Sequence, residues 1–398
     1  MSLPFRYPPF SIPTEFDALR REVREFLNEA AKNWSGWDLG HSWMAFNREF
    51  SREVGRRGWI GITWPKQYGG HERTALERYV VVEEMLAIGA PVGAHWVGDR
   101  QSGPLLLRIG SEAQKQRFLP GIAAGELAFC IGLSEPGAGS DLASIRSRAE
   151  RVAGGWQLNG RKVWTTYAQH SDFMIGLFRS HGSPPLDVNK GTDKHKGLSQ
   201  FLIDLKTPGI EVRPIRDLTG EAHFNEITFD DVFVPDDLLL GQEGEGWAQA
   251  NAELAFERSG PDRYLSSFPL LAPTIDAVRA DERSDLPATN DRLTARRIGE
   301  AVADIVTLRE MSLSILGRLA DGETPAQEAA LTKDLGTTFE QRLPEMVREI
   351  REQLPVRDDS QALSAMHVFL TETTPTFSLR GGTREIMRGI IARGLGLR

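Results

Sequence analysis

The residues with the clearest chemical potential lie in one glycine-rich segment. Residues 130–141 read Cys-Ile-Gly-Leu-Ser-Glu-Pro-Gly-Ala-Gly-Ser-Asp. Glycines at this density let the main chain approach a flat or phosphorylated ligand closely, and Ser134 and Ser140 add hydroxyl groups and backbone donors. The same composition is also typical of an ordinary turn. On these residues alone, a ligand-contacting loop and a plain turn both stay open.

A second segment, residues 162–166, brings an indole close to a hydroxyl group. Alternation along a strand places Trp164 and Thr166 on the same face. An aromatic ring with a hydrogen-bonding neighbour suits a stacked heterocycle. A half-buried core tryptophan beside a strand threonine matches the pattern equally well, so both interpretations are kept.

The elements that would position these segments change in type along the chain. After Thr14, apolar residues recur at helical spacing, which predicts an amphipathic helix packed on a core. Similar patterns predict helices over 44–58, 74–87 and 111–119, with loops at 64–71 and 120–125. Residues 1–125 are therefore predicted to form an N-terminal helical domain.

The middle part, residues 126–240, is predicted to be an antiparallel β domain. Its short runs contain β-branched and aromatic residues and are separated by Gly, Pro and Asp. The runs cover 173–178, 200–205, 210–215 and 224–234. Asn159-Gly160 lies between two strand-like runs and predicts a hairpin turn. The polar residues 181–197 predict an exposed loop.

From Gly241 onward the pattern is helical again. Helices are predicted over 247–257, 291–319, 325–354, 361–370 and 383–391. Residues 241–398 are therefore predicted to form a C-terminal four-helix-bundle domain. The expected fold class is α+β, with the helical domain, the β domain and the bundle in that order.

Composition excludes several classes of function. The chain has 398 residues, with 47 basic and 55 acidic side chains and a net charge of −8, and it lacks the basic character that nucleic acid binding requires. No apolar run is long enough to span a bilayer, and the N-terminus has no signal-peptide pattern, so we expect a cytoplasmic protein. The single cysteine, Cys130, is expected to be buried, and the scattered histidines predict no metal site.

Taken together, these segments resemble the acyl-CoA dehydrogenase family. The resemblance rests on Glu-Pro-Gly-Ala-Gly-Ser-Asp at 135–141, Trp-Thr-Thr at 164–166, Gly-Gly-Thr-Arg-Glu-Ile at 381–386 and the order of the domains. It implies FAD held without a covalent bond between the β domain and the bundle, and α,β-dehydrogenation of an acyl-CoA thioester. It also implies an electron-transferring flavoprotein as electron acceptor, and a homo-oligomer, either a dimer or a tetramer.

The resemblance assigns roles to residues of the β domain. Leu133 and Ser134 would contact the flavin ring, with Ser134 hydrogen-bonded to its pyrimidine side. Trp164 would flank the isoalloxazine, and Thr166 would hydrogen-bond near N5 and O4. Ser140 would lie close to the bound substrate or the flavin.

The resemblance also extends to the C-terminal domain. Thr383 and Glu385 match positions that contact FAD in the family, with Glu385 where a glutamine often stands. Thr383 and Glu385 are therefore included among the predicted cofactor-binding residues.

The reaction requires a carboxylate that removes the proton α to the thioester. In many family members this is a glutamate directly before Gly-Thr near the C-terminus, a region that reads Gly381-Gly382-Thr383 here. In others, which resemble isovaleryl-CoA and long-chain enzymes, a glutamate precedes an arginine on the first helix of the bundle, which points to Glu257 before Arg258. Helix geometry separates Glu257 from Glu253 by only about 40°, so the Glu-Arg adjacency carries the choice.

Each of these two residues keeps an alternative role. Glu257 could instead belong to a structural ion pair. Arg258 either binds and orients the substrate or fixes the bundle.

Two segments typical of homotetrameric members are missing. Neither Arg-x-x-Phe-Gly nor Gln-x-x-Gly-Gly, which contact the neighbouring subunit's FAD, occurs at the matching places. A subgroup with this pattern includes dehydrogenases for bulky or alicyclic acyl chains, some built as heterotetramers. Two alternatives to a complete dehydrogenase stay open. The missing segments favour the first, a non-catalytic or half-site subunit of a heteromeric acyl-CoA dehydrogenase. The second is a flavin oxidase or monooxygenase on the same fold.

Overall fold

A computed structural model describes residues 5–180, 193–250, 259–281, 291–354 and 361–397. The chain divides into two compact units. The first, called the helical unit here, comprises Met1–Ala45, Thr74–Pro91 and Glu257–Arg398. The second, called the sheet unit, comprises Phe46–Arg73 and Val92–Phe256. Contacts thus group residues differently from the three ranges 1–125, 126–240 and 241–398, which remain a prediction from sequence.

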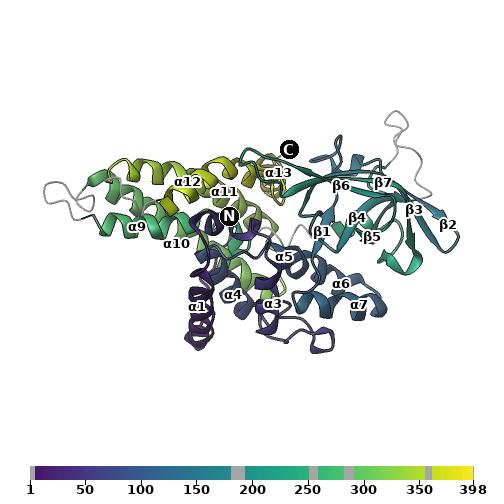
Figure 1. Cartoon of the computed structure of the whole chain (residues 1–398), viewed down its shortest axis with the longest axis horizontal. Coiled ribbons are helices and arrows are strands. Elements are labelled where there is room, and N and C mark those ends of the chain that lie inside the picture. The colour runs from purple at the N-terminus through teal and green to yellow at the C-terminus, as the bar shows by residue number, and fades with distance from the viewer. Residues whose placement is uncertain (1–4, 181–192, 251–258, 282–290, 355–360, 398) are drawn as a thin grey trace. The chain divides into compact units, whose positions relative to one another are not determined.

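The helical unit consists of helices and short 3₁₀ turns (Figure 1). Its α-helices are α1 (Asp17–Ala31), α2 (Gly36–His41), α4 (Ala75–Ile88), α9 (Leu271–Arg279), α10 (Arg292–Ala320), α11 (Ala326–Arg351), α12 (Gln361–Thr373) and α13 (Arg384–Gly394). Its 3₁₀ turns include η8 (Pro261–Arg263) and η12 (Thr374–Leu379). Sequence periodicity predicted α1, α4 and α10 to α13 and missed the shorter α2 and α9.

Local capping chemistry explains where several of these helices begin. Thr74 forms a reciprocal capping box with Glu77 at the start of α4. The Asp291 carboxylate accepts a hydrogen bond from the Thr294 N–H and caps α10. Thr383 caps α13 in the same way. Because these side chains bond only a few residues ahead, helix starts are readable from sequence.

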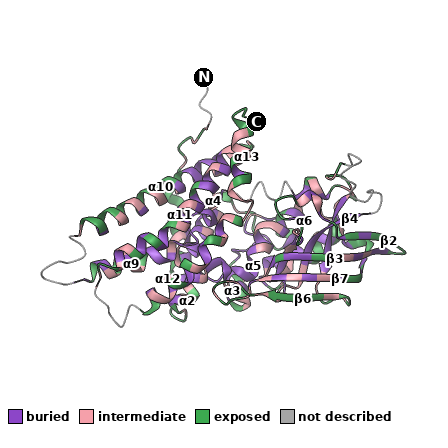
Figure 2. Ribbon diagram, turned by 90° about the horizontal axis from the view of Figure 1, so that it is seen from above, coloured by how far each residue is buried: buried purple, intermediate pink, exposed green. Residues whose placement is uncertain are grey.

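Buried charges tie three helices of this unit together. Glu83 and Glu84 of α4 are each only 7% exposed, and Arg20 of α1 pairs with both. Arg309 of α10 donates to Glu83 at 2.6 Å. Figure 2 shows the buried residues of α11 in purple, and Ile350 of α11 is 1% exposed.

The sheet unit combines helices with one eight-stranded sheet. Its α-helices include α3 (Arg48–Arg56), α5 (Gly93–Val97), α6 (Gly103–Ile109) and α7 (Glu112–Ala123). Residues 246–250 are also helical, and the rest of the helix predicted over 247–257 lies outside the described residues. The strands are β1 (Phe129–Gly132), β2 (Arg148–Val152), β3 (Gly155–Thr166), β4 (Phe173–Ser180), β5 (Leu198–Asp204), β6 (Ile210–Ile215), β7 (Phe224–Pro235) and β8 (Leu239–Leu240). Their order is β6-β7-β3-β2-β4-β5-β8, and β1 pairs with β4. Cys130 on β1 is buried, as predicted.

The sheet is mixed, whereas the sequence predicted an antiparallel β domain. Most neighbours are antiparallel, but β1 and β2 both run parallel to β4. The reason lies in the connection after β3, because β4 does not pair with β3 but lies on the other side of β2. Since β2 and β4 both run opposite to β3, they run parallel to each other. Local sequence carries no record of that placement.

The predicted hairpin turn at Asn159-Gly160 is wrong. Both residues lie inside β3, and the turn between β2 and β3 is at Gly154, which has a φ of +78°. The register against β7 shifts between Leu158 and Gly160. A β carbon on Gly160 would lie 2.3 Å from the Ser147 hydroxyl oxygen, so the glycine serves close packing rather than a turn.

The predicted loop at 120–125 is also wrong in part, because α7 continues through Pro120 to Ala123. Proline removes one backbone donor but does not end this helix. The Pro120 carbonyl still accepts a bond from the Ala124 N–H at 2.9 Å. Within the described ranges, no helix is long and apolar enough to cross a membrane.

Candidate functional site

The glycine-rich loop begins with a tight turn two residues after β1. Glu135 and Ala138 exchange two backbone hydrogen bonds of 3.0 Å around Pro136 and Gly137. Proline suits the second position of such a turn because its φ is already set. Ser140, two residues beyond the turn, is exposed. The loop therefore has a fixed start and a solvent-facing end.

A backbone hydrogen bond joins this loop to β3. The Val163 N–H donates to the Ser134 carbonyl at 2.9 Å. Leu133 and Ser134 are both partly buried. The bond places Ser134 beside the strand that carries Trp164 and Thr166, so the two segments found in the sequence lie next to each other.

Trp164 occupies an irregularity of β3. The pairing with β7 shifts register between Lys162 and Thr165, which accommodates one extra residue. Trp164 has a φ of +61°, in the left-handed region that a bulky residue rarely adopts. Its side chain is 58% exposed, and its ring packs edge-on against Phe224 with centroids 5.9 Å apart. A strained backbone that exposes an aromatic ring is a common feature of ligand sites.

Thr166 completes this surface of the sheet unit. It pairs with Phe224 in the β3–β7 register and is half-buried, whereas Thr165 is 1% exposed. The hydroxyl groups of Ser134 and Thr166 have no hydrogen-bond partner among the residues that the structure describes. An exposed indole and a hydroxyl on one strand, with a second hydroxyl on the loop bonded to that strand, suit a flat heteroaromatic group with hydrogen-bonding edges, such as the isoalloxazine of FAD.

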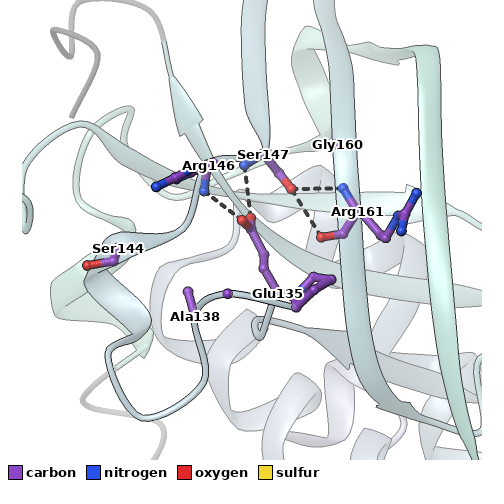
Figure 3. A pocket seen from close by; sticks show the side chains of 9 residues that line it. Glu135, Ala138, Ser144, Arg146, Ser147, Gly160 and Arg161 are labelled. Carbon is purple, nitrogen blue, oxygen red and sulfur yellow. Dashed lines mark hydrogen bonds between the residues drawn. The ribbon is translucent and has the colours of Figure 1, made fainter. Parts of the chain in front are cut away.

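A buried ion pair lies behind this surface. Lys162 is 0% exposed, and its ammonium donates to Glu135 Oε1 at 2.9 Å and to the Leu133 carbonyl at 3.2 Å. The Glu135 carboxylate also accepts from the backbone N–H groups of Arg146 at 2.6 Å and Ser147 at 2.9 Å (Figure 3). The pair therefore fixes the loop to the start of β2 and to β3.

Charge and burial compete at this pair. Burial lowers the pKa of Lys162 to about 8, although the Glu135 carboxylate opposes that change. Burial also pushes the pKa of Glu135 upward, but the Lys162 ammonium and the backbone donors outweigh it, so that the pKa lies below its usual value. Both groups are thus charged at neutral pH.

A pocket of about 400 Å³ opens beside Glu135. Figure 3 shows the labelled lining residues, with the Glu135 side chain directed toward Arg146 and Ser147. The lining residues do not include Ser134, Trp164 or Thr166. In the described part of the chain, no group of three or more His, Cys, Asp or Glu side chains is placed to hold a metal ion.

The helical unit carries the C-terminal segment. Gly381 and Gly382 have φ values of +63° and +99°. A β carbon on Gly381 would lie 3.0 Å from Arg263 Nη2, so this guanidinium takes the space into which a side chain at position 381 would extend. Thr383 caps α13, accepting a hydrogen bond from the Ile386 N–H at 3.4 Å.

Glu385 lies in the first turn of α13 and is exposed. Its own backbone N–H and the Thr383 side chain hold the pKa of Glu385 below its usual value. The Glu385 carboxylate is therefore ionised at neutral pH and exposed to solvent. A ligand at the surface could contact it directly.

Buried side chains support the Gly381-Gly382 turn from below. Lys333 donates to the Gly382 carbonyl at 2.6 Å. Glu340, 0% exposed, accepts from Arg380 at 2.9 Å and from the Ser266 N–H at 2.8 Å. Burial raises the pKa of Glu340 even though Arg380 opposes the change.

The predicted site residues divide between the two units. The sheet unit brings Leu133, Ser134, Trp164 and Thr166 together, with Ser140 further along the loop, while Thr383 and Glu385 lie on the helical unit. Glu257 and Arg258 lie outside the described residues.

Sequence reasoning did not single out Lys162 or Arg263 as site residues. One signal for Lys162 was available, because it shares strand parity with the buried Trp156 and Leu158. For Arg263 no local signal exists, since its neighbour Gly381 is far away in the chain.

Family models match three consecutive parts of the chain. They are described as the acyl-CoA dehydrogenase N-terminal, middle and C-terminal domains and match residues 13–126, 130–232 and 244–396. The chain belongs to the acyl-CoA dehydrogenase family, and it is an oxidoreductase of that family's fold. The resemblance found in the sequence is thereby confirmed.

Individual relatives agree with this assignment. The acyl-CoA dehydrogenase IpdE1 of Mycobacterium tuberculosis is 32% identical over 394 residues, which cover 96% of this chain and 98% of the relative. A solved structure titled Tcur3481-Tcur3483 steroid ACAD superimposes with a TM-score of 0.84 at 26% identity, covering 97% of this chain and 98% of that one. The ChsE4-ChsE5 complex of Mycobacterium tuberculosis gives a TM-score of 0.80 at 26% identity, with 98% and 99% covered.

Proposed function

We propose that this protein is an FAD-dependent acyl-CoA dehydrogenase that introduces an α,β double bond into an acyl-CoA thioester. The observation that carries the proposal lies in the sheet unit, where β3 exposes the Trp164 indole two residues before Thr166 and the Ser134 carbonyl accepts a hydrogen bond from Val163. Family membership supplies the class of cofactor and substrate. The surface supplies an aromatic contact and hydrogen-bond donors of the kind that a flavin ring needs.

In the proposed reaction the chain's own residues position the reactants and move one proton. Leu133, Ser134, Trp164 and Thr166 hold and orient the flavin ring, while Thr383 and Glu385 contact the cofactor from the helical unit. Glu257 removes the proton from the α carbon of the thioester. Bound FAD supplies a two-electron acceptor for the hydride that leaves the β carbon. The C–H bonds at the α and β carbons break, the double bond forms, and the proton stays on the Glu257 carboxylate.

The surroundings of Gly381 support Glu257 as the base. Position 381, where many relatives carry the base, has no carboxylate here. The Arg263 guanidinium lies 3.0 Å from the β-carbon direction of that glycine. A base from elsewhere in the chain is therefore needed, and Glu257, next to Arg258, matches the second position known in the family.

Replacing Glu257 tests the proposal. Glu257→Gln should retain flavin and fold but lose nearly all anaerobic bleaching of the flavin by acyl-CoA substrates. Glu253→Gln is the matched control, a glutamate four residues earlier in the sequence, and should bleach at a rate close to that of the parent protein. Undiminished bleaching by Glu257→Gln would refute the base assignment, and rapid reoxidation of the reduced flavin by air would indicate an oxidase instead.

A heteromeric assembly is the second candidate function, in which this chain is one half of a composite dehydrogenase. Two observations favour it: the sequence segments that contact a neighbouring subunit's FAD in the family are absent, and one similar solved structure is titled as the ChsE4-ChsE5 complex. Flavin content and mass in solution discriminate the cases. About one flavin per chain in a homo-oligomer supports the complete enzyme, and flavin retained only with a second gene product supports the heteromer.

A further inference from the structure

Lys162 is a fully buried cation whose position needs an explanation. Its ammonium lies 5.0 Å from the centre of the Phe178 ring and donates to two acceptors, Glu135 Oε1 and the Leu133 carbonyl. Removing two charges from water usually costs more than their attraction returns, and apolar replacements of buried pairs are often neutral or stabilising. Fold stability alone is therefore a weak reason for this pair.

The Leu133 carbonyl connects the Lys162–Glu135 pair to the Leu133–Ser134 peptide group. The structure has no cis peptide bond in its described part, so the carbonyl of Leu133 and the N–H of Ser134 point to opposite sides of one planar group. The carbonyl is directed at the ammonium. The Ser134 N–H is therefore directed away from Lys162, and no acceptor for it occurs among the residues that the structure describes.

A cation at the carbonyl end also changes the donor at the other end. An ammonium polarises the peptide group, and hydrogen bonds in a chain strengthen one another, more so where the local dielectric is low. The Ser134 N–H, which is directed away from Lys162, becomes a stronger donor. Glu135 opposes this effect, because its carboxylate lies 2.9 Å from the same ammonium.

We propose that Lys162 is a positioning residue for the flavin, acting through the Leu133–Ser134 peptide, and that it favours the reduced cofactor. Reduction of a flavin adds electron density to its pyrimidine side, so a polarised N–H directed there binds the reduced form more tightly than the oxidised form. Glu135 tunes the effect in the opposite direction. The inference rests on the proposed function, since it assumes that the flavin ring lies against Ser134.

Substitution of either residue should change the reduction potential of bound flavin, because both substitutions remove the positive charge of Lys162. Lys162→Met removes the cation, so the preference for reduced flavin should fall about tenfold, which is about 30 mV to the negative for a two-electron couple. Glu135→Gln removes the carboxylate that keeps the buried Lys162 protonated, and the loss of that cation outweighs the loss of the opposing charge, so the potential should again move to the negative, by less than in Lys162→Met. The FAD dissociation constant of Lys162→Met should also rise about tenfold, as measured by titrating apoprotein with FAD and following flavin fluorescence.

Arg48→Met is the matched control in the same unit. Arg48 pairs with Asp172 at 3.0 Å, and in the described residues it forms no hydrogen bond with the Leu133–Ser134 peptide. This variant should lose some thermal stability and leave the potential unchanged. If Lys162→Met does not fold, the sign of the Glu135→Gln shift decides alone.

The possible outcomes separate the inference from the proposed function. Negative shifts for both variants, with no shift in the control, support the inference. Equal potentials in all four proteins, or a positive shift in Lys162→Met or Glu135→Gln, overturn it while leaving the flavin assignment intact. A parent protein that binds no FAD, alone or with a partner chain, overturns the proposed function instead.

Discussion

Two turns that contain glycine, one in each unit, are held by buried carboxylates in different electrostatic situations. In the sheet unit, Glu135 accepts from Lys162 and two backbone N–H groups, and its pKa lies below the usual value. In the helical unit, Glu340 pairs with Arg380, yet burial raises its pKa. The difference follows from burial, because Glu340 is 0% exposed and Glu135 is 9% exposed.

The two turns also present different groups to their surroundings. The turn at Glu135 leaves the neighbouring Ser134 with an N–H and a hydroxyl that have no partner in the described residues. The turn at Gly381 has the Arg263 guanidinium 3.0 Å from its β-carbon direction, so a side chain there would have to displace this group. A buried carboxylate can therefore stabilise a turn that presents hydrogen-bond donors or a turn that another side chain covers. Which of the two results depends on the groups around the turn.

The largest expected effect comes from discharging the more deeply buried carboxylate. Glu340→Gln removes the buried carboxylate that pairs with Arg380 and should lower the free energy of unfolding by about 3 kcal/mol in urea denaturation. Glu345→Gln, on the same helix, breaks an exposed pair with Arg348 and should cost less than about 1 kcal/mol. Equal costs would mean that burial does not distinguish the two glutamates.

The pH dependence of stability should report Lys162. Its pKa is about 8 in the folded chain and about 10.5 ordinarily, so between these values the unfolded chain holds a proton that the folded chain has released. Stability of the parent relative to Lys162→Met should therefore rise with pH across this window, by up to about 3 kcal/mol.

The pKa of Lys162 in the folded chain depends on two neighbouring charges. The charged groups that act on Lys162 are Glu135, which raises its pKa, and Arg179, which lowers it. Urea unfolding of both proteins at several pH values gives the difference. A flat difference from pH 8 to 10.5 would show that Lys162 keeps its ordinary pKa.

A smaller effect is expected at the turn of the helical unit. Gly381→Ala should cost about 1–2 kcal/mol because of the left-handed backbone, and more because the new methyl group meets Arg263. Gly322→Ala is the control, since Gly322 has a φ of +80° and nothing near its β-carbon direction. The extra loss at position 381, seen as a lower thermal midpoint, measures the Arg263 contact. Equal midpoints would show that the guanidinium moves aside freely.

The smallest expected effect concerns a single hydroxyl of the candidate flavin surface. Thr166→Val should weaken FAD binding by about 1 kcal/mol, the usual net value of one hydrogen bond, or roughly fivefold in the dissociation constant. Thr228→Val on β7 is the control, because Thr228 is also a half-buried strand threonine but pairs in register with Arg161. A larger loss of FAD binding in Thr228→Val than in Thr166→Val would place the flavin elsewhere on the sheet.

Much of the fold could be predicted from sequence because its signals are local. The periodicities that predicted α10, α11 and the strands β4 to β7 arise from residues a few positions apart. Asn159-Gly160 shows the limit of such reasoning. Its two residues favour a turn, yet cross-strand pairing with β7 and the close approach of Ser147 keep them inside β3.

The sequence by itself determined the family, the order of helical and β regions and the segments around Ser134, Trp164 and Thr383. Only the tertiary structure decided how these groups are presented. The bulge that exposes Trp164, the Lys162 ammonium at the Leu133 carbonyl and the Arg263 guanidinium against Gly381 all depend on residues distant in the chain. Their geometry follows from packing between elements, and neither residue type nor local spacing encodes which distant group completes a contact.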